Sequence, residues 1–210
     1  MPDLETYADE PELISRSRDG DLAAFNVLVE RYQRPLYNLC LRMLAASEAA
    51  EDATQDAFIH AYRSINTFRG GSFRAWLFRI GANACYDEMR RRRARPALSL
   101  DERHGEVERP IDVPDTAPVP HEHMERKELA EALQEALTRL PADQRLAIVL
   151  ADVQGLEYSE IAVAMECSLG TVKSRISRGR RQLRIILRAR GELLPSRLRQ
   201  VSEGQNDAVV

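Results

Sequence analysis

Apolar residues recur at intervals of three and four along most of the chain, which is the period of an amphipathic helix. This pattern predicts helices over residues 22–32 and 36–43, a further helix that begins near Glu48, and another over residues 72–93. A last stripe, within residues 129–140, ends at a proline, which is a common helix stop signal. No segment shows the alternation of period two that strands require, so the pattern predicts an all-α fold.

A segment of different composition separates the two groups of helices. Residues 96–124 contain five of the ten prolines and seven acidic residues against two arginines, with little apolar periodicity. Such a segment cannot bury enough apolar surface to fold alone, so we interpret it as an extended, acidic, Pro-rich linker, or as no more than a tether. The chain therefore divides into an acidic N-terminal extension, two small helical domains around the linker, and a C-terminal tail, at residues 1–20, 21–95, 125–190 and 191–210.

Two short helices with a tight turn between them are predicted in the second domain. The first covers residues 159–165, and the second begins after Ser168, whose side chain is a good helix cap. The second helix is expected to bury a stripe of four apolar residues, Leu169, Val172, Ile176 and Leu183. This arrangement is that of a helix-turn-helix, in which the second helix enters the major groove of DNA.

The opposite face of that second helix carries polar and cationic side chains. Residues 167–191 contain eight cations and no acid, although the whole chain has a formal net charge of −3. Arginine and lysine suit guanine edges or phosphates, whereas serine is versatile. The alternative is a solvated helix face. The candidate DNA contacts are Thr171, Lys173, Ser174, Arg175, Ser177 and Arg178.

The predicted helix over residues 72–93 carries two parallel stripes. One is apolar, is expected to face the core, and comprises Phe73, Leu77, Ile80 and Ala84. The adjacent stripe interleaves aromatic, cationic and amide side chains, namely Trp76, Arg79, Asn83, Tyr86 and Arg90. Such a surface suits unpaired DNA, because bases stack on rings while cations hold the phosphates. The alternative is that Trp76 and Tyr86 complete the core.

The predicted helix that begins near Glu48 has an apolar side and an acidic side. The apolar side comprises Ala53, Ala57, Phe58, Ala61 and Ile65. The other side carries Glu48, Asp52, Gln55 and Asp56. From spacing alone, the acidic side is either a solvated face or a docking surface.

Three runs of the sequence resemble the extracytoplasmic-function sigma factors, which lend promoter recognition to RNA polymerase. The run LPADQRLAIVLADVQGLEYSEIAVAMECSLGTVKSRISRGRRQLR is similar to region 4 of that family, which reads the minus-35 promoter element. The run AAEDATQDAFIHAYRSINTF is similar to region 2.2, and FRGGSFRAWLFRIGANACYDEMRRRRAR is similar to regions 2.3 and 2.4. The resemblance covers nearly all of residues 20–95 and 125–188, in the family's order.

The resemblance implies a non-enzymatic alternative sigma factor and assigns roles to residues. The acidic helix face would bind the clamp of the polymerase largest subunit through Asp52, Gln55, Asp56 and Phe58. The minus-10 element would be recognised and melted by Phe68, Ser72, Trp76, Arg79, Asn83, Tyr86 and Arg90. The loop over residues 68–72 would form a pocket for a flipped base, lined by Asn83.

Two residues depart from the family pattern around the helix-turn-helix. Glu166 stands where the family often has glycine in the turn, and Glu157 stands where serine or threonine often caps the first helix. Both departures are expected to weaken local stability.

The implied partners are core RNA polymerase, at its largest-subunit clamp and its flap, promoter DNA, and an anti-sigma factor. We expect a cytoplasmic protein that is monomeric when free and does not insert into a membrane, because the sequence has neither a secretion signal nor a long apolar run. No cofactor or metal is expected, since Cys40, Cys85 and Cys167 lie far apart without a CxxC pair. Cys85 and Cys167 are either redox sensors or packing residues.

Two other classes of protein compete with this interpretation. A helix-turn-helix regulator that acts beside polymerase would need a dimerisation surface and a ligand or phosphorylation domain, and the first domain shows neither. An enzyme acting on nucleic acid would need a metal site, for which Asp52 and Asp56 are the nearest candidates. The sequence has no phosphate-binding glycine loop and no HExxH pair. Three histidines, His104, His121 and His123, fall in the predicted linker, where a preorganised site is not expected.

Overall fold

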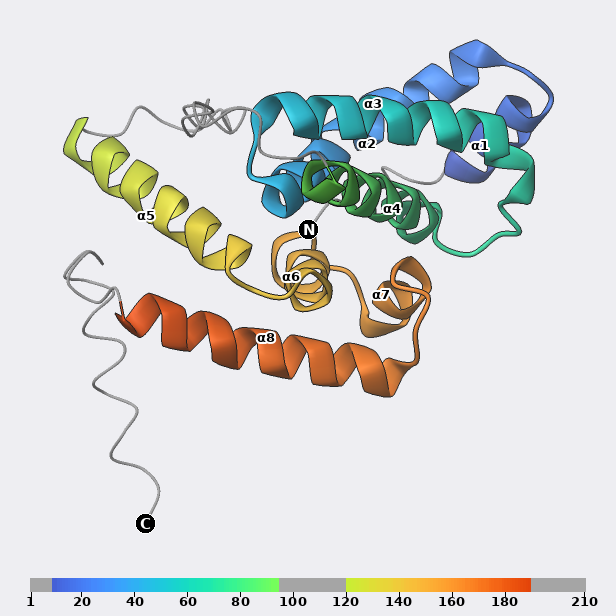
Figure 1. The fold of residues 1–210 in the computed structure, drawn as a ribbon. Coiled ribbons are helices and arrows are strands. Elements are labelled where there is room, and N and C mark those ends of the chain that lie inside the picture. Colours follow the sequence, from blue (N-terminus) through green and yellow to red (C-terminus); the bar gives the residue numbers. More distant parts are fainter. Residues whose placement is uncertain (1–8, 95–119, 190–210) are drawn as a thin grey trace.

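The computed structural model describes residues 9–94 and 120–189, with side chains from residue 129 onward in the second part. The first part contains α1 (Glu10–Arg18), α2 (Leu22–Leu44), α3 (Ser47–Ser64), a 3-10 turn η2 (Ile65–Thr67) and α4 (Phe73–Ala94). The second part contains α5 (Pro120–Thr138), α6 (Ala142–Ile148), a π-helical turn η3 (Val149–Val153), α7 (Tyr158–Ala164) and α8 (Leu169–Ala189) (Figure 1). No strand occurs in these two ranges, and the predicted all-α fold is confirmed.

The predicted linker and tail fall mostly outside the described residues. Helix α5 begins at Pro120, so the last five residues assigned to the linker, 120–124, are helical. The rest of that segment and the tail from residue 190 lie beyond the described ranges.

Helices α2, α3 and α4 pack around one apolar core, as the helical periodicity predicts. Leu36 and Leu39 of α2 and Leu77 of α4 are fully buried in it. Helix α2 is capped by Asp21, the residue before its start, whose carboxylate accepts a hydrogen bond from the backbone N–H of Ala24 at 3.1 Å. This bond, together with the Arg16 guanidinium, lowers the pKa of Asp21, so the cap is ionised at neutral pH.

Helix α1 is an element that the sequence analysis did not predict. It occupies residues assigned to an acidic extension, and it packs against α2 through Leu13 and Ile14, which are buried. Its start is tied to α2 by an ion pair between Arg31 and Asp9 at 2.9 Å and by a hydrogen bond from the Tyr32 hydroxyl to Glu10. The acidic N-terminal segment therefore contributes to the first domain.

The second half contains the predicted helix-turn-helix. Val172 and Ile176 of α8 are buried, and the Ser168 hydroxyl accepts a hydrogen bond from the backbone N–H of Thr171 at 3.2 Å, so the predicted cap is confirmed. Leu169 was predicted to be buried, but its side chain, at the first residue of α8, is 50% exposed. A Cβ at Gly179 would lie 3.2 Å from the backbone oxygen of Gln144, so glycine permits α8 to approach α6 closely.

The two departures from the family pattern have opposite consequences. Glu157 was expected to weaken the start of α7, and this expectation is wrong, because Glu157 and Glu160 form a capping box. In it the Glu160 carboxylate accepts from the backbone N–H of Glu157 at 3.0 Å. Glu166 adopts a left-handed conformation with φ of 48°, in which a residue other than glycine costs about 1 kcal/mol.

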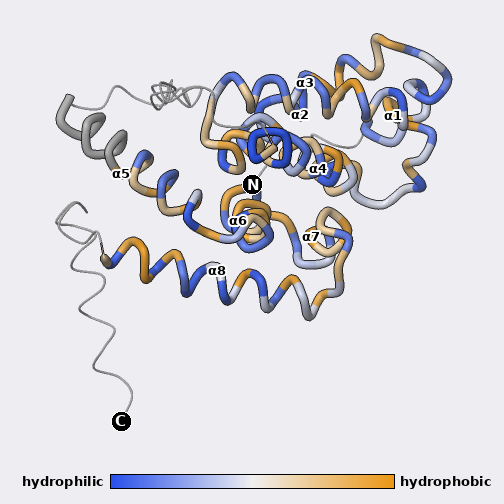
Figure 2. The backbone as a smooth tube through the Cα atoms, in the orientation of Figure 1, coloured by the Kyte–Doolittle hydropathy of each residue, from blue (hydrophilic) through white to orange (hydrophobic). Residues whose placement is uncertain are grey.

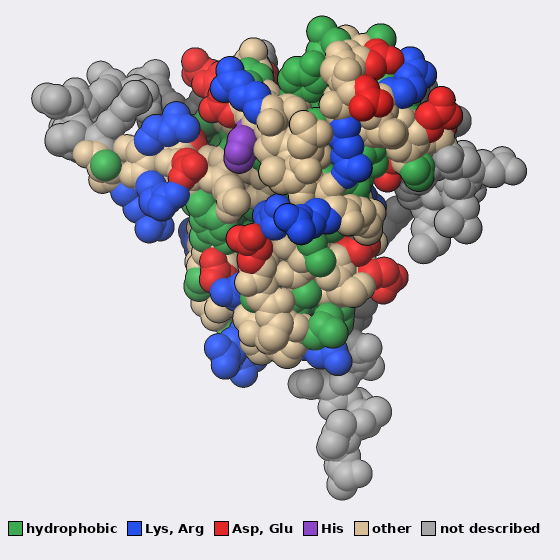
Figure 3. Space-filling model, turned by 90° about the vertical axis from the view of Figure 1, so that its right-hand side faces the viewer, with side chains coloured by type: hydrophobic (Ala, Val, Ile, Leu, Met, Phe, Trp, Pro, Cys, Tyr) green, Lys and Arg blue, Asp and Glu red, His purple; other side chains and the backbone are tan. Residues whose placement is uncertain are grey.

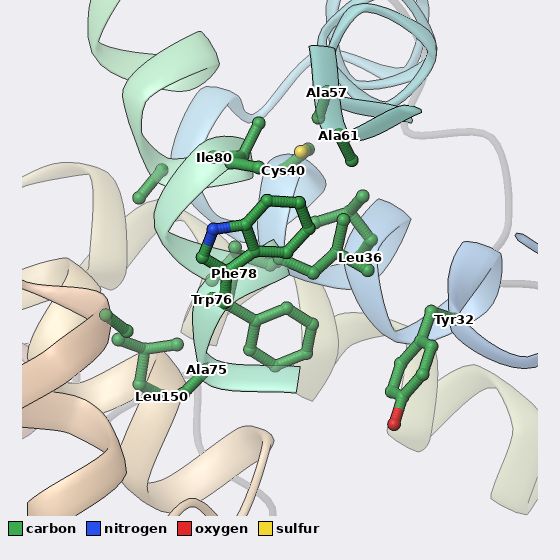
Figure 4. Close-up of a cluster of buried hydrophobic side chains, with 14 of the residues drawn as sticks. Tyr32, Leu36, Cys40, Ala57, Ala61, Ala75, Trp76, Phe78, Ile80 and Leu150 are labelled. Atoms are coloured by element: carbon green, nitrogen blue, oxygen red, sulfur yellow. The ribbon is translucent and has the colours of Figure 1, made fainter. Parts of the chain in front are cut away.

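The two domains pack directly against each other. Helices α6 and α7 lie between α4 and α8 (Figure 1), and a single apolar core extends from α2 and α4 into the helix-turn-helix. Leu150 of η3 and Ala75 of α4, both fully buried, belong to this one core (Figure 4). Helix α6 changes from polar residues at its start to apolar residues at its end, and its last four residues, 145–148, are buried (Figure 2).

Two buried polar side chains join the domains at the ends of α2 and α5. The Arg145 guanidinium, only 8% exposed, donates to the carbonyl of Met43 at 2.5 Å and to that of Thr138 at 2.6 Å. Gln134 accepts from Arg42 at 2.8 Å and donates to two carbonyls at the end of α2. The last carbonyls of a helix have no partner within it, so these side chains satisfy groups that burial would otherwise leave unpaired.

Candidate nucleic-acid interface

Helix α8 lies at the edge of the molecule, with α6 and α7 between it and α4 (Figure 1), and three of its six predicted DNA contacts are exposed. Lys173, Ser177 and Arg178 are exposed there. The remaining three candidates are half-buried: Thr171, Ser174 and Arg175. The Arg175 guanidinium is held by the Asp143 carboxylate of α6 at 2.6 Å.

A basic groove that the sequence analysis did not single out lies beside these residues. It has a volume of about 380 Å³ and is lined by Tyr158, Lys173, Ile176, Ser177, Arg180, Arg181 and Arg184. Asp152 of η3 binds Arg180 at 2.5 Å; this hydrogen bond raises the pKa of Arg180 and fixes its guanidinium at the groove. Cations around a narrow groove suit phosphate groups. The sequence feature that could have indicated this groove is the run of cations that continues past Arg178.

Helix α4 carries the stripe of polar residues that was predicted to meet unpaired DNA. Asn83 and Arg90 are exposed, and Arg90 pairs with Asp87 one turn earlier. Arg79 and Tyr86 are half-buried. Burial and a hydrogen bond to Asp143 raise the pKa of Tyr86, so its hydroxyl remains a donor.

The two aromatic candidates Phe68 and Trp76 are buried, with exposed fractions of 6% and 5%. Their ring centroids lie 5.6 Å apart, and Trp76 lies 5.4 Å from Phe73. The alternative that Trp76 is a core residue therefore holds in this conformation. Tyr86 is only half-buried and contributes to the core with part of its side chain. Within the described residues the indole N–H of Trp76 has no hydrogen-bond acceptor, although it is enclosed by the cluster shown in Figure 4.

This unpaired donor gives a prediction for the substitution Trp76→Phe. The smaller ring buries less apolar surface, but the substitution also removes a donor whose burial costs roughly 1–3 kcal/mol. We expect the free energy of unfolding to change by less than about 1 kcal/mol, measured by urea denaturation. A loss of 3 kcal/mol or more would show that the indole N–H has a partner in solution.

The loop before α4 forms the wall of a second cavity. Gly70 and Gly71 have φ of 92° and 87°, a left-handed conformation that glycine adopts without strain. The cavity, of about 530 Å³, is lined by Glu10, Pro11, Ile14, Arg18, Asn66, Phe68, Arg69, Gly70 and Gly71. Helix α1 thus supplies one wall, and Asn83 is not among the lining residues. Arg18 fixes the loop by donating to the carbonyl of Phe68.

The acidic face of α3 is exposed on the side of the molecule opposite α8 (Figure 1). Asp52, Gln55 and Asp56 point to solvent, whereas Phe58 is half-buried and packs against the core. Among the described residues, no group of three or more His, Cys, Asp or Glu side chains is arranged to hold a metal ion. On the side of the molecule shown in Figure 3, acidic and basic side chains are interspersed.

The cysteines occupy two different environments. Cys40 and Cys85 are fully buried in the first domain, and Cys167 is half-buried. The neighbouring Cys40 thiol and burial raise the pKa of Cys85, so Cys85 is a protonated thiol within the core.

Comparison with known proteins shows which family combines these two domains. Residues 28–95 match the family described as Sigma-70 region 2, and residues 130–183 match Sigma-70, region 4. The chain belongs to the sigma-70 family. The sigma factor is 35% identical to the RNA polymerase sigma-H factor of Pseudomonas aeruginosa, over 83% of this chain and 92% of that protein. It is 38% identical to the ECF RNA polymerase sigma-E factor of Escherichia coli K12, over 80% and 88%.

Two solved structures share the fold of this sigma factor. One is CnrH in complex with the cytosolic domain of CnrY, with a TM-score of 0.63 and 28% identity over 84% of this chain and 96% of that one. The other is RpoE of Bartonella quintana in complex with the anti-sigma factor NepR, with a TM-score of 0.57 and 28% identity over 78% and 96%.

The comparisons confirm an extracytoplasmic-function sigma factor that directs promoter-specific initiation of transcription. Both sigma regions are present in the expected order, which a helix-turn-helix regulator acting beside polymerase does not require. Sigma factors are non-catalytic initiation factors. In the described ranges, none of the helices combines the length and apolar character that a membrane span needs.

Proposed function

We propose that this sigma factor docks on core RNA polymerase through α3 and reads promoter DNA with α4 and α8. The main support for this proposal is the position of two exposed helix faces, the acidic face of α3 and the cationic face of α8. The acidic face of α3 and the cationic face of α8 are exposed on opposite sides of the molecule, so polymerase and duplex DNA can be bound at once (Figure 1). The docking residues are Asp52, Gln55, Asp56 and Phe58, which would meet the clamp of the largest subunit, with region 4 meeting the flap.

The minus-10 element is assigned to α4 and the loop before it. The contact residues are Phe68, Ser72, Trp76, Arg79, Asn83, Tyr86 and Arg90. Exposed cations and amides would hold the unpaired strand, and the cavity beside Gly70 and Gly71 is large enough for a flipped base. Phe68 and Trp76 would have to move out of the core to stack on bases. In this proposal the polymerase catalyses RNA synthesis, and promoter recognition by this chain requires no metal or cofactor.

The minus-35 element is assigned to α8, through Thr171, Lys173, Ser174, Arg175, Ser177 and Arg178. Exposed cations on the first turns of this helix would contact base edges, and the groove lined by Arg180, Arg181 and Arg184 would hold the phosphate backbone.

The double substitution Lys173→Ala and Arg178→Ala tests this assignment. Base contacts of this kind contribute roughly 1–3 kcal/mol each, so we expect at least a tenfold loss of run-off transcript from a promoter selected by the wild-type holoenzyme. Association with core polymerase should not change. The matched control, Arg139→Ala with Arg188→Ala, removes the same charge from exposed positions outside the assigned contacts. Equal losses in the two variants would contradict the assignment.

An anti-sigma factor is a further proposed partner. The solved structure of RpoE from B. quintana is a complex with an anti-sigma factor, and CnrH was solved with the cytosolic domain of CnrY. We infer that the protein is cytoplasmic and monomeric when free. We also infer that an anti-sigma factor binds and inhibits it until transcription from its target promoters is needed. Pull-down with candidate anti-sigma factors tests this inference.

A further inference from the structure

The cavity of about 530 Å³ beside the loop glycines has two walls that come from distant parts of the sequence. One wall is the loop before α4, and the other is α1, which contributes Glu10, Pro11, Ile14 and Arg18. Arg18 donates to the carbonyl of Phe68, and its guanidinium carbon lies 5.8 Å from the centroid of the Phe68 ring. These contacts hold α1 against the loop, so a ligand that fills the cavity contacts both elements.

Glu10 is the one acidic side chain in the lining of this cavity. It is half-buried, and its carboxylate accepts a hydrogen bond from the Tyr32 hydroxyl. A carboxylate offers about four lone-pair sites, so Glu10 can accept from a further donor. Burial raises the pKa of Glu10, which indicates that its charge lacks part of its hydration at this wall. A hydrogen-bond donor brought into the cavity would therefore meet an acceptor that is only partly hydrated.

The other lining side chains suit the remaining parts of a nucleotide. Arg69 is exposed and suits a backbone phosphate, while the exposed amide of Asn66 can both donate to and accept from a base edge. Asn83, which the family resemblance assigns to the base pocket, is not in the lining. The choice of base in this cavity must therefore come from another residue, and a carboxylate separates bases more sharply than an amide does because it only accepts.

We propose that Glu10 selects the base that enters this cavity, by accepting a hydrogen bond from an exocyclic amino group on the pairing edge of that base. The proposal rests on the function proposed above, which places a flipped base of the unpaired strand here, and it names the residue that chooses the base. Helix α1 is then a DNA-reading element in addition to α4 and α8.

Thymine is the DNA base that this arrangement disfavours. Cytosine, adenine and guanine each carry an exocyclic amino group, whereas thymine has carbonyl oxygens on both sides of its ring N–H. A carboxylate beside such an oxygen brings two acceptors together, and a half-buried site offers little water to separate them. A good contact to a base edge gives about tenfold discrimination against the wrong base.

Run-off transcription from premelted promoters tests the proposal with the full chain and core polymerase. Cytosine or uracil is placed at each position of the minus-10 element of the non-template strand in turn, opposite a non-complementary template strand, so that duplex stability does not change. Cytosine carries an amino group at C4 where uracil carries a carbonyl, and neither base has the methyl group of thymine. At one position we expect the wild type to yield about tenfold more transcript with cytosine than with uracil.

The variant Glu10→Gln should lose this preference, because an amide can donate to the C4 carbonyl as well as accept from the amino group. The control Glu12→Gln removes the same charge from the first turn of α1, at an exposed position that does not line the cavity, and should keep the preference. Each result is a ratio between two promoters, so a smaller folded fraction does not alter it. The same ratio for the wild type and Glu10→Gln at every position would overturn the proposal.

Disulfide trapping measures the contact itself. A cytosine that carries a thioethyl group on N4, protected as a mixed disulfide, is placed at the position that discriminates. The holoenzyme is formed with Glu10→Cys or Glu12→Cys in a Cys167→Ser background, in which Cys40 and Cys85 are fully buried. Thiol–disulfide exchange should join the DNA to the Glu10→Cys chain and not to the Glu12→Cys chain. Trapping in neither chain, or equally in both, would overturn the proposal.

The transcripts also separate this proposal from the function on which it rests. Promoter-directed RNA from the wild type without a preference between cytosine and uracil contradicts only the role of Glu10. Absence of promoter-directed RNA from the wild type and from both glutamine variants contradicts the proposed function, and the choice of base with it.

Discussion

Replacing Arg145 with methionine is expected to lower the free energy of unfolding by about 3 kcal/mol. The guanidinium donates to the carbonyls of Met43, Thr138 and Leu140, which lie at the ends of α2 and α5. Burial lowers the pKa of Arg145, which indicates the cost of enclosing its charge and the need for these acceptors. Methionine fills similar volume but leaves the carbonyls without a donor. Urea denaturation followed by circular dichroism measures the loss.

The control for this experiment is Arg139→Met, the same chemical change at an exposed position near the end of α5. Arg139 pairs only with Glu135 among the described residues, one turn away, and an exposed pair of this kind contributes roughly 0.3–0.5 kcal/mol. Equal stability of the two variants would show that Arg145 does not join the domains in solution. Because Met43 belongs to the first domain and Thr138 to the second, the result also bears on whether the domains are packed together.

Charge reversal on α3 is expected to have the largest effect on activity. The double substitution Asp52→Lys and Asp56→Lys should weaken association with core polymerase at least 100-fold, because like charges across an interface cost several kcal/mol. Both side chains are exposed and lie on the outer face of α3, so the fold should be retained. Association is measured by fluorescence anisotropy with purified core polymerase, and run-off transcription should fall in parallel.

The matched control is Glu12→Lys with Glu30→Lys, which makes the same change in net charge on α1 and α2. It should bind polymerase as the wild type does. If both variants lost affinity equally, the acidic face of α3 would not be the docking surface, and the assignment of Asp52 and Asp56 would be wrong.

The sequence alone predicts what local periodicity determines. The apolar stripe of α4, the helix-turn-helix and its Ser168 cap follow from spacing and capping chemistry, and the structure contains all three. Polar side chains on one side of an amphipathic helix face solvent, and Asp52, Gln55 and Asp56 of α3 and Lys173, Ser177 and Arg178 of α8 are exposed. Thr171, Ser174 and Arg175 are half-buried, because contacts with other helices also decide exposure.

Contacts between distant segments could not be predicted in this way. Helix α1 was missed because its short amphipathic pattern, with Leu13 and Ile14, lies within an acidic segment. The burial of Trp76 depends on Phe68 and Phe73, which meet only after the loop folds. Glu157 was misjudged because its effect depends on Glu160, three residues later, as a reciprocal partner.

The packing of the two domains is the largest feature that the sequence did not indicate. Composition predicts a linker between them but says nothing of whether they meet. Their contact depends on long-range pairs, such as Tyr86 with Asp143 and Arg145 with Met43, which no local pattern contains. A linker of this composition is compatible with both a closed and an open arrangement.

The central claim is tested most directly by run-off transcription with the purified chain, purified core polymerase and a library of promoter fragments. The account predicts transcripts from a defined subset of promoters that share two sequence elements, and none from core polymerase alone. Absence of any promoter-directed RNA, together with failure of the chain to associate with core polymerase, would contradict it.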